Sequence, residues 1–172
     1  MQKFIRLLGI ITLIGLGVWG WFYFFPGPEK VIRSRLNSLA KTVSFKSEDG
    51  IIPRGYKAEK AVGFFSPDID TQFELRGWEN FHVTTREELS QLLLIGARQL
   101  RSLKVEFLDI NVTLGADRQT AKANLTAKWS IGGSRDFDVQ ELNFLLKKVD
   151  RTWLIYRVET VKTLSLKSSP AA

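Results

Sequence analysis

The sequence predicts an α+β domain, with three helices packed on an antiparallel sheet, behind an N-terminal helix that crosses a membrane. Apolar and polar residues alternate along residues 119–131, which is typical of a strand with one buried face. Residues 89–103 place apolar side chains on one continuous face at helical spacing. Residues 7–25 carry no charge, and about 20 apolar residues span a bilayer core. Because a half-apolar sheet must cover its apolar face, we expect the upstream helices to pack there.

The N-terminal segment, residues 1–27, is predicted to be an uncleaved membrane anchor. A cleaved signal peptide is the alternative, but bulky aromatic residues stand where its cleavage site would carry small ones. Aromatic and basic residues suit the lipid–water boundary, and the predicted membrane-interface set is Trp19, Trp21, Tyr23, Lys30 and Arg33. The two basic residues of this set either contact lipid phosphates or belong to an ordinary solvated helix face.

The orientation of the anchor is predicted from the basic residues near its ends. Lys3 and Arg6 immediately precede the apolar run and favour a cytoplasmic N terminus, although the basic residues after the run oppose it in a simple count. We therefore expect a single-pass membrane protein whose soluble domain lies outside the cytoplasm, in the periplasm if the cell is Gram-negative.

The composition excludes several kinds of site. The 172 residues include no cysteine and one histidine, which rules out disulfides, a cysteine nucleophile and metal sites built on thiolates or several histidines. No glycine-rich phosphate loop is present, so no cofactor and no metal is expected. The net charge of +7 suits anionic lipid or nucleic acid. Nucleic acid is the minor option, because aromatic residues that would stack on bases do not share the basic face of the sheet.

The domain itself is expected over residues 28–165, followed by a disordered tail at residues 166–172. Helices are predicted at residues 28–43 and 57–65, with a loop over 46–55, and from two overlapping capping boxes at Thr84 and Thr85 to about Ser102. Two short strands, 70–75 and 81–84, lie between the second and third helices.

Four long strands complete the domain, at residues 105–114, 119–131, 135–149 and 152–164. Gly132-Gly133 indicates a hairpin turn between two of them. The alternation breaks at Phe107-Leu108 and again between Val139 and Leu142, and each break predicts a β-bulge.

This order of elements resembles the nuclear transport factor 2-like superfamily over residues 28–164. Local features agree, since the second helix ends in Phe64-Phe65-Ser66-Pro67-Asp68 and Trp153-Leu154-Ile155 follows a turn at Asp150-Arg151. The resemblance implies a cone-shaped domain, in which a strongly bent sheet wraps around the helices and encloses an apolar cavity. It also implies either an enzyme, such as ketosteroid isomerase, a polyketide cyclase or a dehydratase, or a member that only binds.

Glu74 and His82 are the candidate catalytic residues. Enzymes of this superfamily place a carboxylate or histidine base in a dry cavity with a donor for the enolate. Glu74 lies near the position of the isomerase base, but it would point away from the cavity if Phe73 points into it. The first helix lacks the tyrosine of the isomerases, and the dehydratases use more than one histidine. A non-catalytic domain is therefore favoured.

The favoured function is a membrane-anchored, non-catalytic binding or scaffold domain in a membrane-associated assembly with protein partners. This layout resembles the inner-membrane scaffold subunit of type IV secretion machinery, although no motif assigns the chain to that group. An apolar-ligand carrier is a further alternative. Its pocket would be lined by Phe64, Trp129, Phe144 and Trp153, unless these rings only fill the core.

Overall fold

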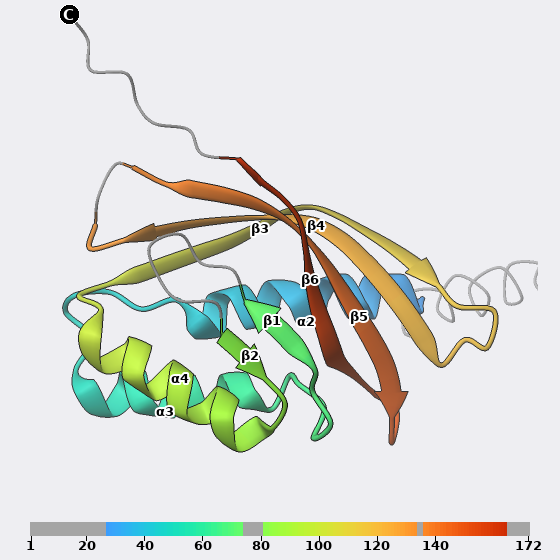
Figure 1. Ribbon diagram of the computed structural model, residues 1–172, viewed down its shortest axis with the longest axis horizontal. Helices are drawn as coiled ribbons and strands as arrows, with labels where there is room; N and C mark the ends of the chain where they lie inside the picture. The colour runs from blue at the N-terminus through green and yellow to red at the C-terminus, as the bar shows by residue number, and fades with distance from the viewer. Residues whose placement is uncertain (1–26, 74–80, 134–135, 165–172) are drawn as a thin grey trace, which may run out of the picture. The chain divides into compact units, whose positions relative to one another are not determined.

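The computed structural model describes residues 27–73, 81–133 and 136–164 (Figure 1). The predicted anchor with its aromatic residues, the candidate base Glu74 and the predicted tail lie outside these ranges. Within them, no helix is both long and apolar enough to span a bilayer. The membrane anchor therefore stays a prediction. The chain divides into two compact units, Met1–Val31 and Ile32–Ala172, and the second contains the whole sheet.

Three helices are present among the described residues, in the expected order: α2 (Pro28–Val43), α3 (Ile51–Val62) and α4 (Arg86–Gln99). Two short strands, β1 (Thr71–Phe73) and β2 (Phe81–Val83), pair antiparallel before α4. The start of α4 confirms one predicted capping box, because Thr85 Oγ1 accepts a hydrogen bond from the Glu88 backbone N–H at 3.2 Å.

Helix α3 begins six residues earlier than expected, so the predicted loop over 46–55 is wrong in its second half. Pro53 falls in the first turn, where a missing N–H costs no intrahelical hydrogen bond. Gly50 is the N-cap, and its ψ of 166° is extended. Gly55 lies where α3 meets α4, since a Cβ atom there would be 3.9 Å from Leu94 Cδ2. Residues that resemble loop formers thus begin the helix and bring it close to its neighbour.

The four long strands form one antiparallel sheet in the order of the sequence: β3 (Leu103–Leu114), β4 (Thr120–Ile131), β5 (Asp138–Val149) and β6 (Thr152–Leu164). The predicted turn after β4 is confirmed by φ angles of 71° at Gly132 and 73° at Gly133, which glycine adopts without strain. Figure 1 shows the helices on one side of this sheet and the long strands bending over them.

Register shifts occur in both regions where the alternation breaks. The first lies between Leu108 and Asn111 on β3, where Asp109 has a φ of 51°. The β5–β6 pair has two more, between Glu141 and Leu142 and between Leu145 and Leu146. An unpaired extra residue increases the local twist and bends a strand, which helps the sheet to curve over the helices.

The core lies between the helices and the inner face of the sheet. Strand β4 contributes small side chains, Ala121, Ala123 and Ala127, which let the helix layer approach closely. Helix α2 buries its predicted face there, with Ile32 and Leu36 fully buried. The apolar face of the helices and the apolar face of the sheet therefore pack together in one core.

Candidate functional site

A cavity of about 350 Å³ lies between the helices and the inner face of the sheet. Its walls come from the end of α2, from α3 and α4, and from all four long strands. Leucine, valine, phenylalanine and alanine side chains make up most of the surface, including Leu92, Leu93 and Leu142. Pockets of this size and composition hold small apolar ligands.

Two of the four predicted pocket rings line the cavity. Trp129 and Phe144 lie on its wall, and Phe144 packs against Phe107 with ring centroids 5.5 Å apart. Phe64 and Trp153 are instead buried in the core and are not part of the cavity wall. The Phe64 ring lies under the Arg35 guanidinium at 4.7 Å, a cation–π contact.

Polar groups enter the cavity from the sheet. Gln140 is 3% exposed, and its Nε2 donates to Thr160 Oγ1 at 3.2 Å. A hydroxyl that accepts one hydrogen bond still has its own proton to donate, so Thr160 can serve a ligand oxygen. Asp138, half-buried at the start of β5, is the one carboxylate in the described cavity wall. No local pattern in the sequence indicates these residues, because their inward direction depends on the strand register.

The two cations in the cavity wall already have partners. Arg54 is buried and donates to the carbonyl oxygens of four residues, Lys46, Ser47, Leu100 and Arg101, at 2.9–3.1 Å. Lys57 Nζ bonds the Asp49 carboxylate at 2.9 Å and the Ser44 carbonyl oxygen at 3.2 Å. Both side chains therefore hold the loop before α3 in place, and a ligand does not need to pair with them.

His82 lies outside the cavity, on the surface. Its side chain is 61% exposed, and Nε2 is 2.9 Å from Asp70 Oδ1. Asp70 is also paired with Arg157 of β6. Hydrogen bonds from His82 and then Arg157 lower the pKa of Asp70. The histidine thus belongs to a surface ion-pair group that joins β2 to β6 and does not face the cavity.

A second surface ion pair, between Asp68 and Lys147, ties the chain before β1 to β5. Hydrogen bonds from Lys147 and then Ser66 lower the pKa of Asp68 from 3.8 to about 2. This segment also covers the edge of β6, since the Ser66 N–H donates to the Ile155 carbonyl at 2.7 Å. The ionised Asp68 carboxylate therefore helps to hold the segment before β1 against the edge of the sheet.

Acid is expected to weaken this contact. Because the folded pKa of Asp68 is about 2 and its ordinary value is 3.8, the contribution is present above about pH 4 and is lost as the pH falls towards 2. Replacing Asp68 by Asn should flatten the dependence of unfolding free energy on pH in that window. The effect will be small and salt-sensitive, because the side chain is exposed. Glu87→Gln is the control, and an equal flattening by that variant would contradict the assignment.

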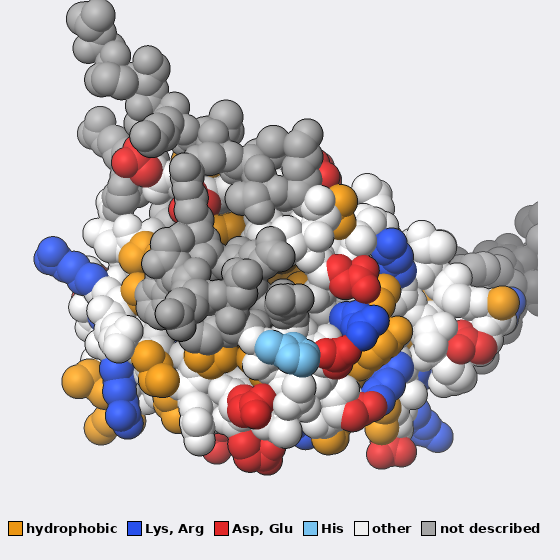
Figure 2. Space-filling model, in the orientation of Figure 1, with side chains coloured by type: hydrophobic (Ala, Val, Ile, Leu, Met, Phe, Trp, Pro, Cys, Tyr) orange, Lys and Arg blue, Asp and Glu red, His pale blue; other side chains and the backbone are white. Residues whose placement is uncertain are grey.

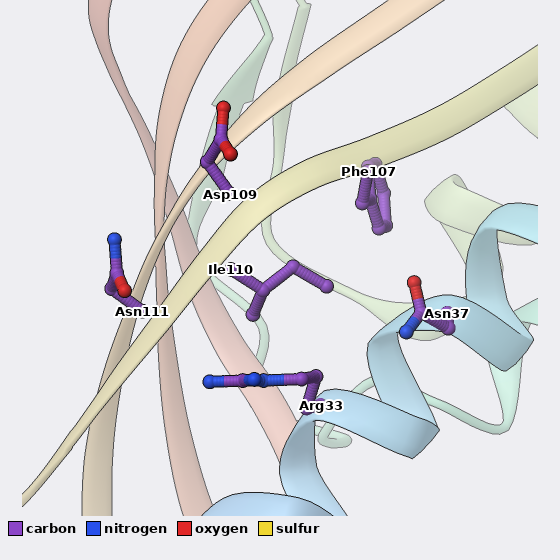
Figure 3. A pocket seen from close by; sticks show the side chains of 6 residues that line it. All are labelled: Arg33, Asn37, Phe107, Asp109, Ile110 and Asn111. Atoms are coloured by element: carbon purple, nitrogen blue, oxygen red, sulfur yellow. The ribbon is translucent and has the colours of Figure 1, made fainter.

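An open polar groove of about 380 Å³ lies between α2 and the bulged part of β3 (Figure 3). Arg33 and Asn37 come from α2, and Ile110 points from β3 towards that helix. Asp109 and Asn111 point away from it on either side of the bulge. Arg33 and Lys30, the predicted lipid contacts, are exposed, and their contact with lipid stays a prediction.

Metal binding finds no support in the described ranges, where no group of three histidine, cysteine, aspartate or glutamate side chains is placed to hold an ion. The carboxylates at Asp49, Asp68 and Asp70 are each engaged with a cation. Among the described residues, the candidate site is therefore the cavity, whose wall is mainly apolar.

No family model and no curated protein sequence matches the chain. Its structure is similar to a nuclear transport factor 2-like protein of unknown function from Pseudomonas putida KT2440, with a TM-score of 0.63, 12% identity, and coverage of 84% of this chain and 99% of that one. A cystatin-like domain of unknown function from Nostoc punctiforme gives a TM-score of 0.63 at 16% identity, covering 83% and 81%.

A third similar structure is a candidate scytalone dehydratase from Novosphingobium aromaticivorans, with a TM-score of 0.56, 14% identity, and coverage of 81% of this chain and 88% of that one. At such identities the likeness shows the fold alone. The predicted nuclear transport factor 2-like fold is thus confirmed.

Proposed function

We propose that this is a non-catalytic binding domain, held at a membrane by its N-terminal segment, whose cavity takes one apolar small molecule. The observation that carries the proposal is the cavity of about 350 Å³, with walls that are mainly aliphatic and aromatic. Burial of apolar surface is worth roughly 25 cal/mol per Å², so such a wall favours a ligand of matching apolarity. The predicted scaffold role among protein partners stays a prediction.

The ligand should carry one polar oxygen. Thr160 and Gln140 are the hydrogen-bonding pair in the wall, and they lie side by side on β6 and β5. A carbonyl or hydroxyl oxygen of the ligand would accept from Thr160 while the rest of the molecule contacts the leucines. This arrangement suits an alcohol, a ketone or an ester with a bulky apolar body.

Proton transfer is the alternative use of the same cavity, and Asp138 is the carboxylate placed for it. A general base needs a partner that stabilises the developing charge. Thr160 can donate one hydrogen bond to a developing enolate oxygen, but His82 lies outside the cavity and the cations Arg54 and Lys57 are engaged elsewhere. Binding without turnover is therefore the function that the described residues support best.

Filling the cavity tests the proposal. Gly96 lines the cavity on α4, and a Cβ atom there would meet nothing within 4 Å. Gly96→Leu should therefore fit without strain and should raise the unfolding free energy by about 1 kcal/mol, because glycine is a poor helix former. It should also weaken the binding of an apolar fluorescent probe, such as a naphthalene dye, by about tenfold or more.

The matched control is Ile95→Leu, at the preceding residue of α4, which is 45% exposed and outside the cavity. This variant should bind the probe as the parent chain does. Equal probe affinity in the parent chain and in Gly96→Leu would contradict binding in the cavity, because Gly96 lines its wall.

A further inference from the structure

Large apolar side chains are exposed at the end of the helix layer where α3 begins. The exposed fractions are 71% for Ile51, 86% for Ile52 and 66% for Tyr56. Ile95 on α4 adds a fourth side chain, 45% exposed. We call these four residues the α3–α4 tip. Single exposed apolar residues are normal on a protein surface. Several large apolar side chains exposed in the same region instead mark an interaction site.

The contacts of Arg54 show that the parts of the tip lie together. Its guanidinium, three residues after Ile51, donates to the Leu100 and Arg101 carbonyl oxygens just beyond α4, at 2.9 Å each. Gly55 packs against Leu94, the residue next to Ile95. The start of α3 and the end of α4 are therefore adjacent. At the lower left of Figure 2, where Figure 1 draws these helices, hydrophobic and basic side chains lie next to each other.

The charge around the tip is positive. Glu48 and Asp49, the acidic residues of the preceding loop, pair with Lys46 at 3.2 Å and Lys57 at 2.9 Å. Arg98 and Arg101 are exposed and form no ion pair with the described residues. One turn further along α3, Glu59 and Lys60 are both exposed and cancel in net charge. Two unpaired arginines thus flank the apolar side chains.

We infer that the α3–α4 tip binds the surface of an anionic lipid bilayer. Isoleucines beside arginines are the pattern of helices that lie in the lipid interface, where the apolar residues enter the boundary and the cations meet head groups. Tyrosine suits the same depth, because its ring is apolar and its hydroxyl is polar. A lipid surface is favoured over a protein partner because the side chains project from two adjacent helix ends that carry unpaired cations, which complement lipid phosphates.

This contact goes beyond the proposed ligand binding and does not depend on it. This contact would also bring the cavity close to the bilayer. Arg54 and Leu100 both line the cavity wall and are hydrogen-bonded to each other next to the tip.

Depth-dependent quenching tests the inference. Because the chain has no cysteine, Ile52→Cys carries a single thiol for an environment-sensitive dye. The full chain is mixed with phosphatidylcholine vesicles that contain phosphatidylglycerol and an acyl-chain quencher. We expect strong quenching at position 52 and none at position 149, labelled through Val149→Cys, which is an exposed apolar residue of another element. Equal quenching at the two positions, or none at position 52, would overturn the inference.

The contribution of charge has its own readout. Adding Arg98→Glu and Arg101→Glu to the labelled chain should weaken vesicle binding of the tip by about tenfold or more, because each basic residue near an anionic surface contributes roughly fivefold. Circular dichroism confirms that the variant is folded. Quenching at position 52 that is the same with and without phosphatidylglycerol would contradict the role of the arginines. Probe binding in the cavity is measured in the same samples, so failure of the tip is distinguishable from failure of the ligand site.

Discussion

Replacing Arg54 by Met is expected to lower the free energy of unfolding by about 3 kcal/mol or more. The side chain is 9% exposed and satisfies four carbonyl oxygens, in the loop at residues 46–47 and at residues 100–101. It also lies over the Phe45 ring, 4.8 Å from its centroid. Methionine keeps much of the apolar stem but leaves four carbonyl acceptors without the donor that joins them. Denaturation in urea measures the change.

Two further variants separate the effect of the several N–H donors of the Arg54 guanidinium from the effect of its charge. Arg54→Lys keeps the charge, but one ammonium cannot reach carbonyl oxygens that lie on two sides, so most of the loss should remain. Arg101→Met removes an exposed guanidinium nearby and should change the unfolding free energy by less than about 0.5 kcal/mol. A cost for Arg54→Met as small as that of Arg101→Met would show that the four hydrogen bonds do not hold the helix layer together.

Trp153→Ala is expected to cost about 3–5 kcal/mol, the second large effect. Trp153 is 2% exposed and belongs to the core beside Ile155 and Leu146. The matched change Trp129→Ala should cost clearly less, because that ring is half-buried and already borders the cavity. In return, Trp129→Ala should weaken probe binding and Trp153→Phe should not. Thermal unfolding and probe titration distinguish the two rings.

Equal stability costs for the two tryptophans would contradict the division between core and cavity wall. Trp153→Phe keeps the protein folded if the alanine variant is too unstable to study, and it should cost about half as much as alanine. A loss of probe binding in folded Trp153→Phe would place this ring in the cavity, as the sequence suggested.

Local patterns were enough to predict most elements. The apolar faces of α2 and α4 and the alternation along β4 arise from residues close in sequence, and the hydrophobic core preserved them. The start of α3 was missed because Pro53 and Gly55 read locally as loop residues. Their role depends on a helix N terminus and on Leu94, which is far away in the sequence. Tertiary packing outweighed local preference there.

The site was harder to predict than the fold. Trp129 and Trp153 look alike in the sequence, and only the helices that cover each of them decide which ring borders empty space. Arg54 resembled a loop cation, because its four acceptors come from two segments that meet only after folding. The Gln140–Thr160 pair depends on the shifted register between β5 and β6. Strand alternation alone does not fix such a register when bulges intervene.

Mass spectrometry under native conditions tests the central claim most directly. The full chain purified from its native cells in mild detergent should carry one apolar small molecule per chain, and Gly96→Leu prepared in the same way should not. If the parent chain carries no such molecule, or if Gly96→Leu retains it equally, the cavity is not a ligand site.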